Sequence, residues 1–132
     1  RSYHSTKLVP LGIGLKNAFK GLKNGEILTM VGDWGVGDSN GIEVLFFGQK
    51  TRFPCGPAEI AVKTKVPVIS GFAVREGINK FYIGCDEPIE WNRQAPEEEQ
   101  IKSITQSFAA NLEKQVRAHP EQWLIFKRIW EI

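Results

Sequence analysis

The sequence of 132 residues predicts an α/β fold in a single domain, residues 1–132. Segments with helical spacing of apolar residues alternate with short runs rich in β-branched and aromatic residues. Glycine and proline separate these segments, and an apolar fraction of 42% with 24% charged residues is typical of a globular protein. We therefore expect a mixed or mostly parallel sheet flanked by helices.

The first half of the chain predicts a helix, two short strands and a second helix. Pro10 suits the first turn of the first helix, and Asn24-Gly25 should end it. The first strand is a short apolar run that ends at Gly32-Asp33, and the second is closed by Gly48. The expected ranges are 10–23 for the first helix, 27–31 and 42–47 for the strands, and 58–65 for the second helix.

The second half predicts a hairpin and two further helices. Residues 66–75 and 81–85 are strand-like and are joined by a turn at 77–80. Residues 96–118 form a long amphipathic pattern, with Glu97, Glu98 and Glu99 at the end where the helix dipole favours acidic groups. Residues 121–130 are expected to form one more short helix.

Composition excludes several classes of site. A net charge of +2 and a pI of 8.6 argue against nucleic acid as a partner. No apolar run approaches the length of a membrane-spanning helix. Cys55 and Cys85 lie far apart in the sequence without a neighbouring histidine, so we expect free thiols and no metal site.

The glycine-rich segment 32–41 does not match a phosphate-binding loop, because no Lys-Ser or Lys-Thr follows it and it leads into a strand. Asp33 has two interpretations that the residues leave open. An acid at the end of a buried strand lies where α/β proteins bind ligands. Alternatively, Asp33 stabilises a turn through its own backbone.

Phe46 and Phe47 are adjacent on an expected strand, so their side chains should point to opposite faces. One then lies in the core, and the other packs either under a neighbouring segment or against an acyl chain. His4 and His119 are the only histidines, and the fifth residue after each is Val9 or Leu124 rather than an acid. We therefore expect no catalytic residue in this chain.

The order of several motifs resembles the lipid A biosynthesis acyltransferases, which belong to the lysophospholipid acyltransferase superfamily. The mycobacterial mannoside acyltransferases of the same superfamily share the Phe-Phe-Gly and Gly-Pro-Ala segments. The matching residues are Leu22-Lys23-Asn24-Gly25-Glu26-Ile27, Gly32-Asp33, Gly41-Ile42-Glu43-Val44-Leu45-Phe46-Phe47-Gly48, Gly56-Pro57-Ala58, Lys65-Val66-Pro67-Val68, His119-Pro120-Glu121-Gln122-Trp123 and Lys127-Arg128-Ile129-Trp130.

The resemblance implies an enzyme that moves a fatty acyl group from acyl carrier protein or acyl-CoA to a hydroxyl of a lipid or glycolipid, without a cofactor. In the family, a His and an acid with four residues between them form the general base. That pair lies upstream of the matching region. This chain is therefore expected to be the C-terminal half of the acyltransferase domain, without catalytic residues of its own and inactive alone.

The resemblance also implies substrate-binding residues. Asp33 matches an acid that binds the acceptor, although Trp34 stands where the family usually has Gln. Arg1 matches an arginine that holds a phosphate, and Arg75 a basic residue after a strand. The remaining residues expected to line the acyl and acceptor cleft are Phe46, Phe47, Gly48 and Gly56.

The partners implied are the N-terminal half of the same enzyme, acyl carrier protein or a CoA thioester, and a glycolipid acceptor. Peripheral membrane contact at the cytoplasmic face of the bacterial inner membrane is also implied. The alternative to the enzyme is a non-catalytic α/β module that binds lipid or another protein.

Overall fold

The computed structural model describes residues 6–10 and 14–130. The chain forms two compact units, residues 1–30 and residues 31–132, and each is described by itself. The α/β class is confirmed by the helices and short antiparallel strands within them. The expectation of a single domain stays a prediction. No helix within the described part of the chain has the length and apolar character required to cross a bilayer.

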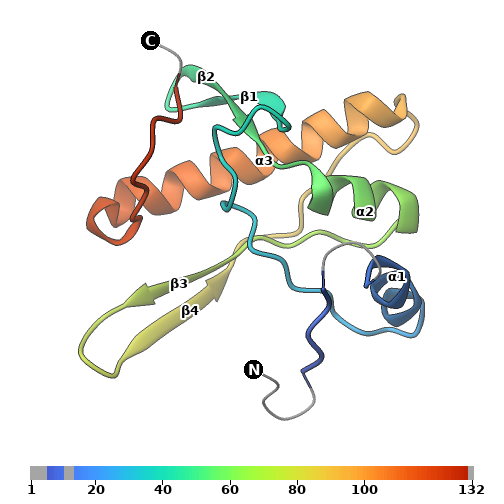
Figure 1. Cartoon of the computed structure of the whole chain (residues 1–132), viewed down its shortest axis with the longest axis horizontal. Coiled ribbons are helices and arrows are strands. Elements are labelled where there is room, and N and C mark those ends of the chain that lie inside the picture. Colours follow the sequence, from blue (N-terminus) through green and yellow to red (C-terminus); the bar gives the residue numbers. More distant parts are fainter. Residues whose placement is uncertain (1–5, 11–13, 131–132) are drawn as a thin grey trace. The chain divides into compact units, whose positions relative to one another are not determined.

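The first unit contains helix α1, Leu15–Lys23 (Figure 1). The helix begins five residues later than the expected start at Pro10, and residues 11–13 lie outside the described part of the chain. The predicted stop is confirmed, because the Asn24 amide donates to the carbonyls of Gly21 and Lys20, and Gly25 follows with φ of 80°. Three lysines of the helix are exposed, Lys16, Lys20 and Lys23.

The strand expected over residues 27–31 is wrong. These residues are irregular, and Ile27 and Val31 are 92% and 75% exposed. A strand needs a neighbour to accept and donate its backbone hydrogen bonds, and no described segment pairs with this run.

The second unit contains two antiparallel hairpins rather than one mixed sheet. Strands β1, Ile42–Phe46, and β2, Gln49–Phe53, pair from Ile42 opposite Phe53 to Phe46 opposite Gln49. Strands β3, Gly71–Arg75, and β4, Phe81–Cys85, form the predicted second hairpin, which is shorter than the pattern suggested. Strand β2 was not predicted, although Thr51 and Phe53 alternate with exposed residues as in a half-buried strand.

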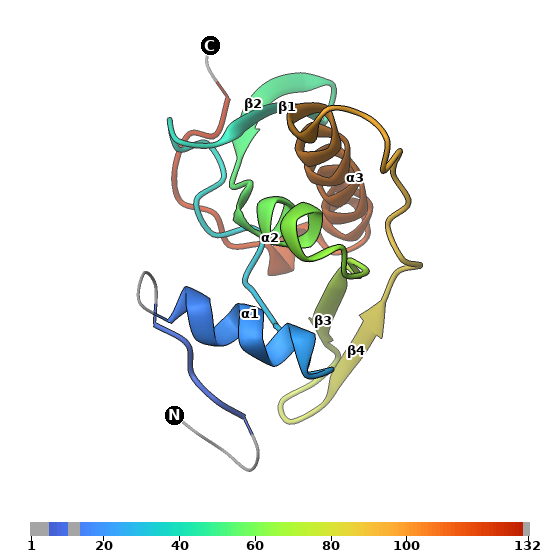
Figure 2. The same cartoon turned by 90° about the vertical axis from the view of Figure 1, so that its right-hand side faces the viewer.

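Helix α3, Glu97–Ala118, runs beside the first hairpin (Figures 1 and 2). Helix α2, Gly56–Thr64, packs on a different part of α3. The long helix confirms the amphipathic pattern almost to the residue. One core lies between α3 and the β1–β2 hairpin, and a smaller one lies between α3 and α2. Gln106 of α3 covers the edge of β1, because its side-chain amide accepts from the Leu45 N–H at 2.8 Å and donates to the Leu45 carbonyl at 2.9 Å.

The last predicted helix, residues 121–130, is wrong. Only a short 3₁₀ turn, Pro120–Gln122, forms, and an irregular segment follows. A helix would place Trp123 and Phe126 on one face, whereas Trp123 packs in the core and Phe126 is exposed. The tertiary contacts of Trp123 and Trp130 therefore decide the path of this segment.

Candidate functional site

The Asp33 carboxylate lies on the loop before β1 and is half-buried. Its backbone carbonyl accepts a hydrogen bond from the Val36 N–H, which closes a turn. This contact agrees with the interpretation in which Asp33 stabilises a turn through its backbone. The side chain does something else, because Asp33 Oδ2 accepts a hydrogen bond of 3.0 Å from the indole Nε1 of Trp123. Asp33 is thus tied to a residue 90 positions away, and Trp34 beside it is largely exposed.

Trp123 packs on a group of rings that we call the aromatic cluster, with Phe46 at its centre. Phe46 is fully buried, and its ring centroid lies 5.5 Å from that of Trp123. Its backbone carbonyl accepts from the Trp130 indole at 3.2 Å. Four rings surround Phe46 in this cluster: Phe47, Phe53, Trp123 and Trp130. The Asp33 carboxylate therefore stands beside a dense apolar region.

The expectation that Phe46 and Phe47 point to opposite faces is wrong. Their ring centroids lie only 4.7 Å apart in an edge-to-face contact. Successive side chains point to opposite faces only within a strand. Phe47 lies instead in the turn between β1 and β2, with φ of 53°. Gly48 follows it with φ of 74°, so both residues of the turn are left-handed, as in a type I′ hairpin.

Glu113 and Arg117 of α3 hold Phe47 in place. Glu113 Oε2 accepts from the Phe47 N–H at 2.8 Å, and Glu113 Oε1 accepts from Arg117 Nη2 at 2.7 Å. The Arg117 guanidinium lies over the Phe47 ring, 4.6 Å from its centroid. The Phe47 N–H, and next the Arg117 side chain, hold the pKa of Glu113 below its usual value.

The Asp33 loop is fixed at several points beyond Asp33. Gly37 N–H donates to the Arg52 carbonyl of β2 at 2.7 Å. Asp38 accepts from Lys127 of the C-terminal segment at 2.6 Å. The glycine-rich loop is therefore held against β2 by a backbone bond, and the exposed Asp38–Lys127 ion pair adds little to this.

Gln122, which precedes Trp123, pairs with the backbone of Arg75 at the end of β3. Its side-chain oxygen accepts from the Arg75 N–H at 2.8 Å, and its amide nitrogen donates to the Arg75 carbonyl at 3.0 Å. The Arg75 guanidinium donates to the carbonyls of Gly77 at 3.0 Å and Ile78 at 2.8 Å. In this structure the charge of Arg75 thus stabilises the turn of its own hairpin.

The structure brings some of the predicted site residues together. Asp33, Phe46, Phe47 and Gly48 meet around the aromatic cluster, whereas Gly56 begins α2 and Arg75 is linked to the cluster only through Gln122. Arg1 lies outside the described residues. Sequence reasoning missed the roles of Gln122, Trp123 and Glu113. The run His119-Pro120-Glu121-Gln122-Trp123 was the available signal, since it combines polar and aromatic side chains just after a helix.

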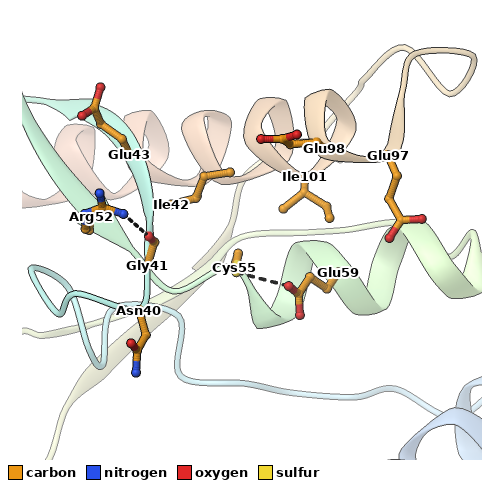
Figure 3. A pocket seen from close by; sticks show the side chains of 10 residues that line it. All are labelled: Asn40, Gly41, Ile42, Glu43, Arg52, Cys55, Glu59, Glu97, Glu98 and Ile101. Atoms are coloured by element: carbon orange, nitrogen blue, oxygen red, sulfur yellow. Dashed lines mark hydrogen bonds between the residues drawn. The ribbon is translucent and has the colours of Figure 1, made fainter.

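A separate open groove of about 470 Å³ lies between the start of β1 and the N-terminal ends of α2 and α3 (Figure 3). Glutamates dominate its charged lining, and Arg52 is directed to the Gly41 carbonyl at 2.8 Å. The Cys55 thiol donates to Glu59 at 3.4 Å, and burial followed by this hydrogen bond raises the pKa of Cys55. A thiol with a raised pKa is a poor nucleophile at neutral pH.

Within residues 6–10 and 14–130 no group of His, Cys, Asp and Glu is arranged to hold a metal ion. His119 follows the last turn of α3, as expected for a histidine at a helix end, and its Nδ1 lies 3.8 Å from Glu121. The Asp33 carboxylate, which accepts from Trp123, lies beside the buried aromatic cluster.

Comparison with known proteins agrees with the motifs. Residues 1–131 match the sequence profile of the family described as bacterial lipid A biosynthesis acyltransferase. The chain is also 26% identical over 133 aligned positions to the phosphatidylinositol mannoside acyltransferase of Mycobacterium tuberculosis, in strains CDC 1551 and H37Rv. These alignments cover 94% of this chain and 38% of the relatives, so the chain spans well under half of their length.

Proposed function

The chain belongs to the bacterial lipid A biosynthesis acyltransferase family, and we propose that it forms the acceptor- and acyl-binding part of a glycolipid acyltransferase. The observation that carries this proposal is the half-buried Asp33 carboxylate held beside the aromatic cluster. A carboxylate accepts hydrogen bonds from sugar hydroxyls, and the partly buried rings of Phe47, Trp123 and Trp130 suit contact with a fatty acyl chain. One site thus offers both chemistries that such an acceptor and donor need.

The proposed reaction is a direct acyl transfer. The acceptor hydroxyl oxygen attacks the carbonyl carbon of a thioester, the carbon–sulfur bond breaks, and the thiol of acyl carrier protein or CoA leaves. A general base takes the hydroxyl proton and returns it to the leaving sulfur. We assign that base to a His and acid pair outside these 132 residues, so the chain alone should not turn over. No cofactor enters this scheme.

Partners and location follow as further parts of the proposal. The partners are the polypeptide that carries the base, the thioester donor and a glycolipid acceptor. The acceptor is a membrane lipid, so we place the enzyme in peripheral contact with the cytoplasmic face of the bacterial inner membrane. Family membership supports this assignment.

The test uses the protein made from the complete reading frame that encodes this chain, with labelled acyl carrier protein and acyl-CoA thioesters as donors. A bacterial glycolipid extract serves as the acceptor, and mass spectrometry identifies the acylated product. We expect transfer by the wild type and at least a roughly tenfold loss of kcat/KM in Asp33→Asn, as for loss of a hydrogen bond to a charged group. Asp38→Asn is the matched control, because this acid lies in the same loop and forms an exposed ion pair of little energetic value.

Three outcomes would contradict the proposal. A complete protein that binds the glycolipid but transfers no acyl group from either donor would be a non-catalytic binding module. Turnover by the 132-residue chain alone would show that the base lies within it. Equal activity of Asp33→Asn and the wild type would remove Asp33 from the acceptor site.

A further inference from the structure

The contact between Trp123 and Asp33 joins the C-terminal segment to the loop of the proposed acceptor site. We propose that Trp123 is a positioning residue, whose indole N–H fixes the Asp33 carboxylate in the orientation that binds the acceptor. This inference rests on the proposed function and adds a residue to it. The structural basis is the 3.0 Å hydrogen bond from Trp123 Nε1 to Asp33 Oδ2 in a half-buried place.

The direction of the Trp123 N–H distinguishes it from a residue that only fills the core. Trp130, in the same aromatic cluster, donates its N–H to the backbone carbonyl of Phe46, a bond that stabilises the hairpin. Trp123 donates to an ionisable side chain that has no other described hydrogen-bond partner. This bond occupies part of one carboxylate oxygen and leaves Oδ1 for a ligand hydroxyl.

The segment that carries Trp123 is itself anchored on both sides. Gln122 makes two hydrogen bonds to the backbone of Arg75. Further along, the Thr51 hydroxyl donates to the Ile129 carbonyl, and Trp130 donates to Phe46. A donor held in this way can set the direction of a carboxylate without first being ordered itself, which is the condition for preorganised binding.

The pairing can be tested without activity. Each of the four tryptophans contributes one indole N–H signal to a ¹H–¹⁵N NMR spectrum, and Trp123→Phe identifies the signal of Trp123. We expect Asp33→Asn to shift that signal while those of Trp91 and Trp130 stay in place, since their acceptors are Gln100 and Phe46. An unchanged Trp123 signal would overturn the proposal.

Kinetics of the complete protein test the consequence. Trp123→Phe keeps an aromatic ring and removes the N–H, so we expect the KM for the acceptor to rise about tenfold while the KM for the thioester donor stays the same. The double variant with Asp33→Asn should be no worse than Asp33→Asn alone. Trp91→Phe is the matched control, because it loses a comparable 3.0 Å bond to Gln100 away from Asp33 and should retain both constants.

A second variant guards against loss of folding. Benzothienylalanine at position 123, introduced by codon suppression, keeps the size of the indole and replaces its N–H by sulfur. It should reproduce the rise in acceptor KM, and a thermal midpoint well above the assay temperature would show that the variant is folded. Wild-type acceptor KM in this variant, or equal losses from Trp123→Phe with and without Asp33, would overturn the proposal. An inactive wild type would instead defeat the proposed function, and the NMR result would still decide the pairing.

Discussion

Phe47 adopts a backbone conformation that bulky residues rarely take, with φ of 53°. Such a residue costs on the order of 1–3 kcal/mol. Its N–H bond to the Glu113 carboxylate contributes about 1.5–3 kcal/mol, and an exposed cation–π contact about 0.5–1 kcal/mol. These interactions are large enough to offset the strain. Phe47 therefore keeps a position where Asn or Gly is the usual choice, and its ring remains in the proposed acyl site.

The carboxylate that holds Phe47 makes stability depend on pH. The pKa of Glu113 is lowered in the folded chain from a usual value of 4.5, chiefly by the Phe47 N–H. Its contribution to stability is therefore complete above the unfolded pKa and is lost as the pH falls through the lower folded value. We expect Glu113→Gln to lose less free energy of unfolding than the wild type when the pH is lowered from about 7 to about 3. Urea denaturation at both pH values measures this.

Glu43→Gln is the control for this titration. The pKa of Glu43 is also lowered, but by the exposed side chain of Lys50. Added salt should abolish the pH effect of Glu43 and leave that of Glu113, because screening acts on exposed charges more than on a backbone hydrogen bond. Equal salt sensitivity of the two variants would contradict this account of Glu113.

At the scale of elements, two glycines shape the β1–β2 hairpin for different reasons: Gly48 lies in its turn, and Gly41 lies just before β1. Gly48 has φ of 74°, and a Cβ there would meet nothing within 4 Å. Gly41 precedes β1. A Cβ there would lie 2.6 Å from the carbonyl oxygen and 2.9 Å from the backbone nitrogen of Phe53. We expect Gly48→Ala to cost about 1 kcal/mol, from backbone strain alone. Gly41→Ala should cost about 2–3 kcal/mol, because backbone must move.

Chemical denaturation of the two alanine variants tests this difference, with Gly25→Ala as a control that carries a positive φ in the first unit, where a Cβ also meets nothing. Gly25→Ala should resemble Gly48→Ala. If Gly41→Ala proves as mild as these two, the close approach of Gly41 to β2 does not constrain the hairpin.

How far the sequence predicted each element depends on where its stabilising contacts lie. Helix α3 was predicted nearly to its ends, because its 22 residues carry the apolar period and the acidic first turn within themselves. Residues 27–31 were misassigned because a strand needs a partner strand from elsewhere in the chain. Residues 121–130 were misassigned because their path follows the contacts of Trp123 and Trp130. Local pattern does not contain either kind of information.

In the candidate site, too, residues with a local signal were predicted, and residues whose role depends on distant contacts were not. Asp33 was found from its place after an apolar run, and Phe46 and Phe47 from their unusual adjacency. Trp123 was not given a role, since its partner lies 90 positions away and no local spacing relates the two. Arg75 was selected for its charge, but its guanidinium binds the carbonyls of Gly77 and Ile78.

At the scale of the whole molecule, the β3–β4 hairpin leaves apolar side chains uncovered within the second unit. Ile83 lies opposite Ala73 and next to Phe81 on the same face, and it is 77% exposed. Ile78 at the tip is more exposed still. Gln122 covers the backbone of Arg75 at the β3 edge, but the β4 edge of this two-stranded hairpin has backbone groups that can pair with another chain. Apolar faces and open edges together favour association.

We therefore expect the 132-residue chain to associate as its concentration rises, which analytical ultracentrifugation would show as a mass above 14.9 kDa. Ile83→Lys places a charge on the exposed face and should shift the chain toward the monomer. Leu124→Lys adds the same charge at a side chain that is 73% exposed outside the hairpin, and should leave association unchanged. Monomer at every concentration would mean that the hairpin face does not drive association. An equal effect of both variants would mean that net charge governs it, so the two lysines separate a specific surface from a general change in solubility.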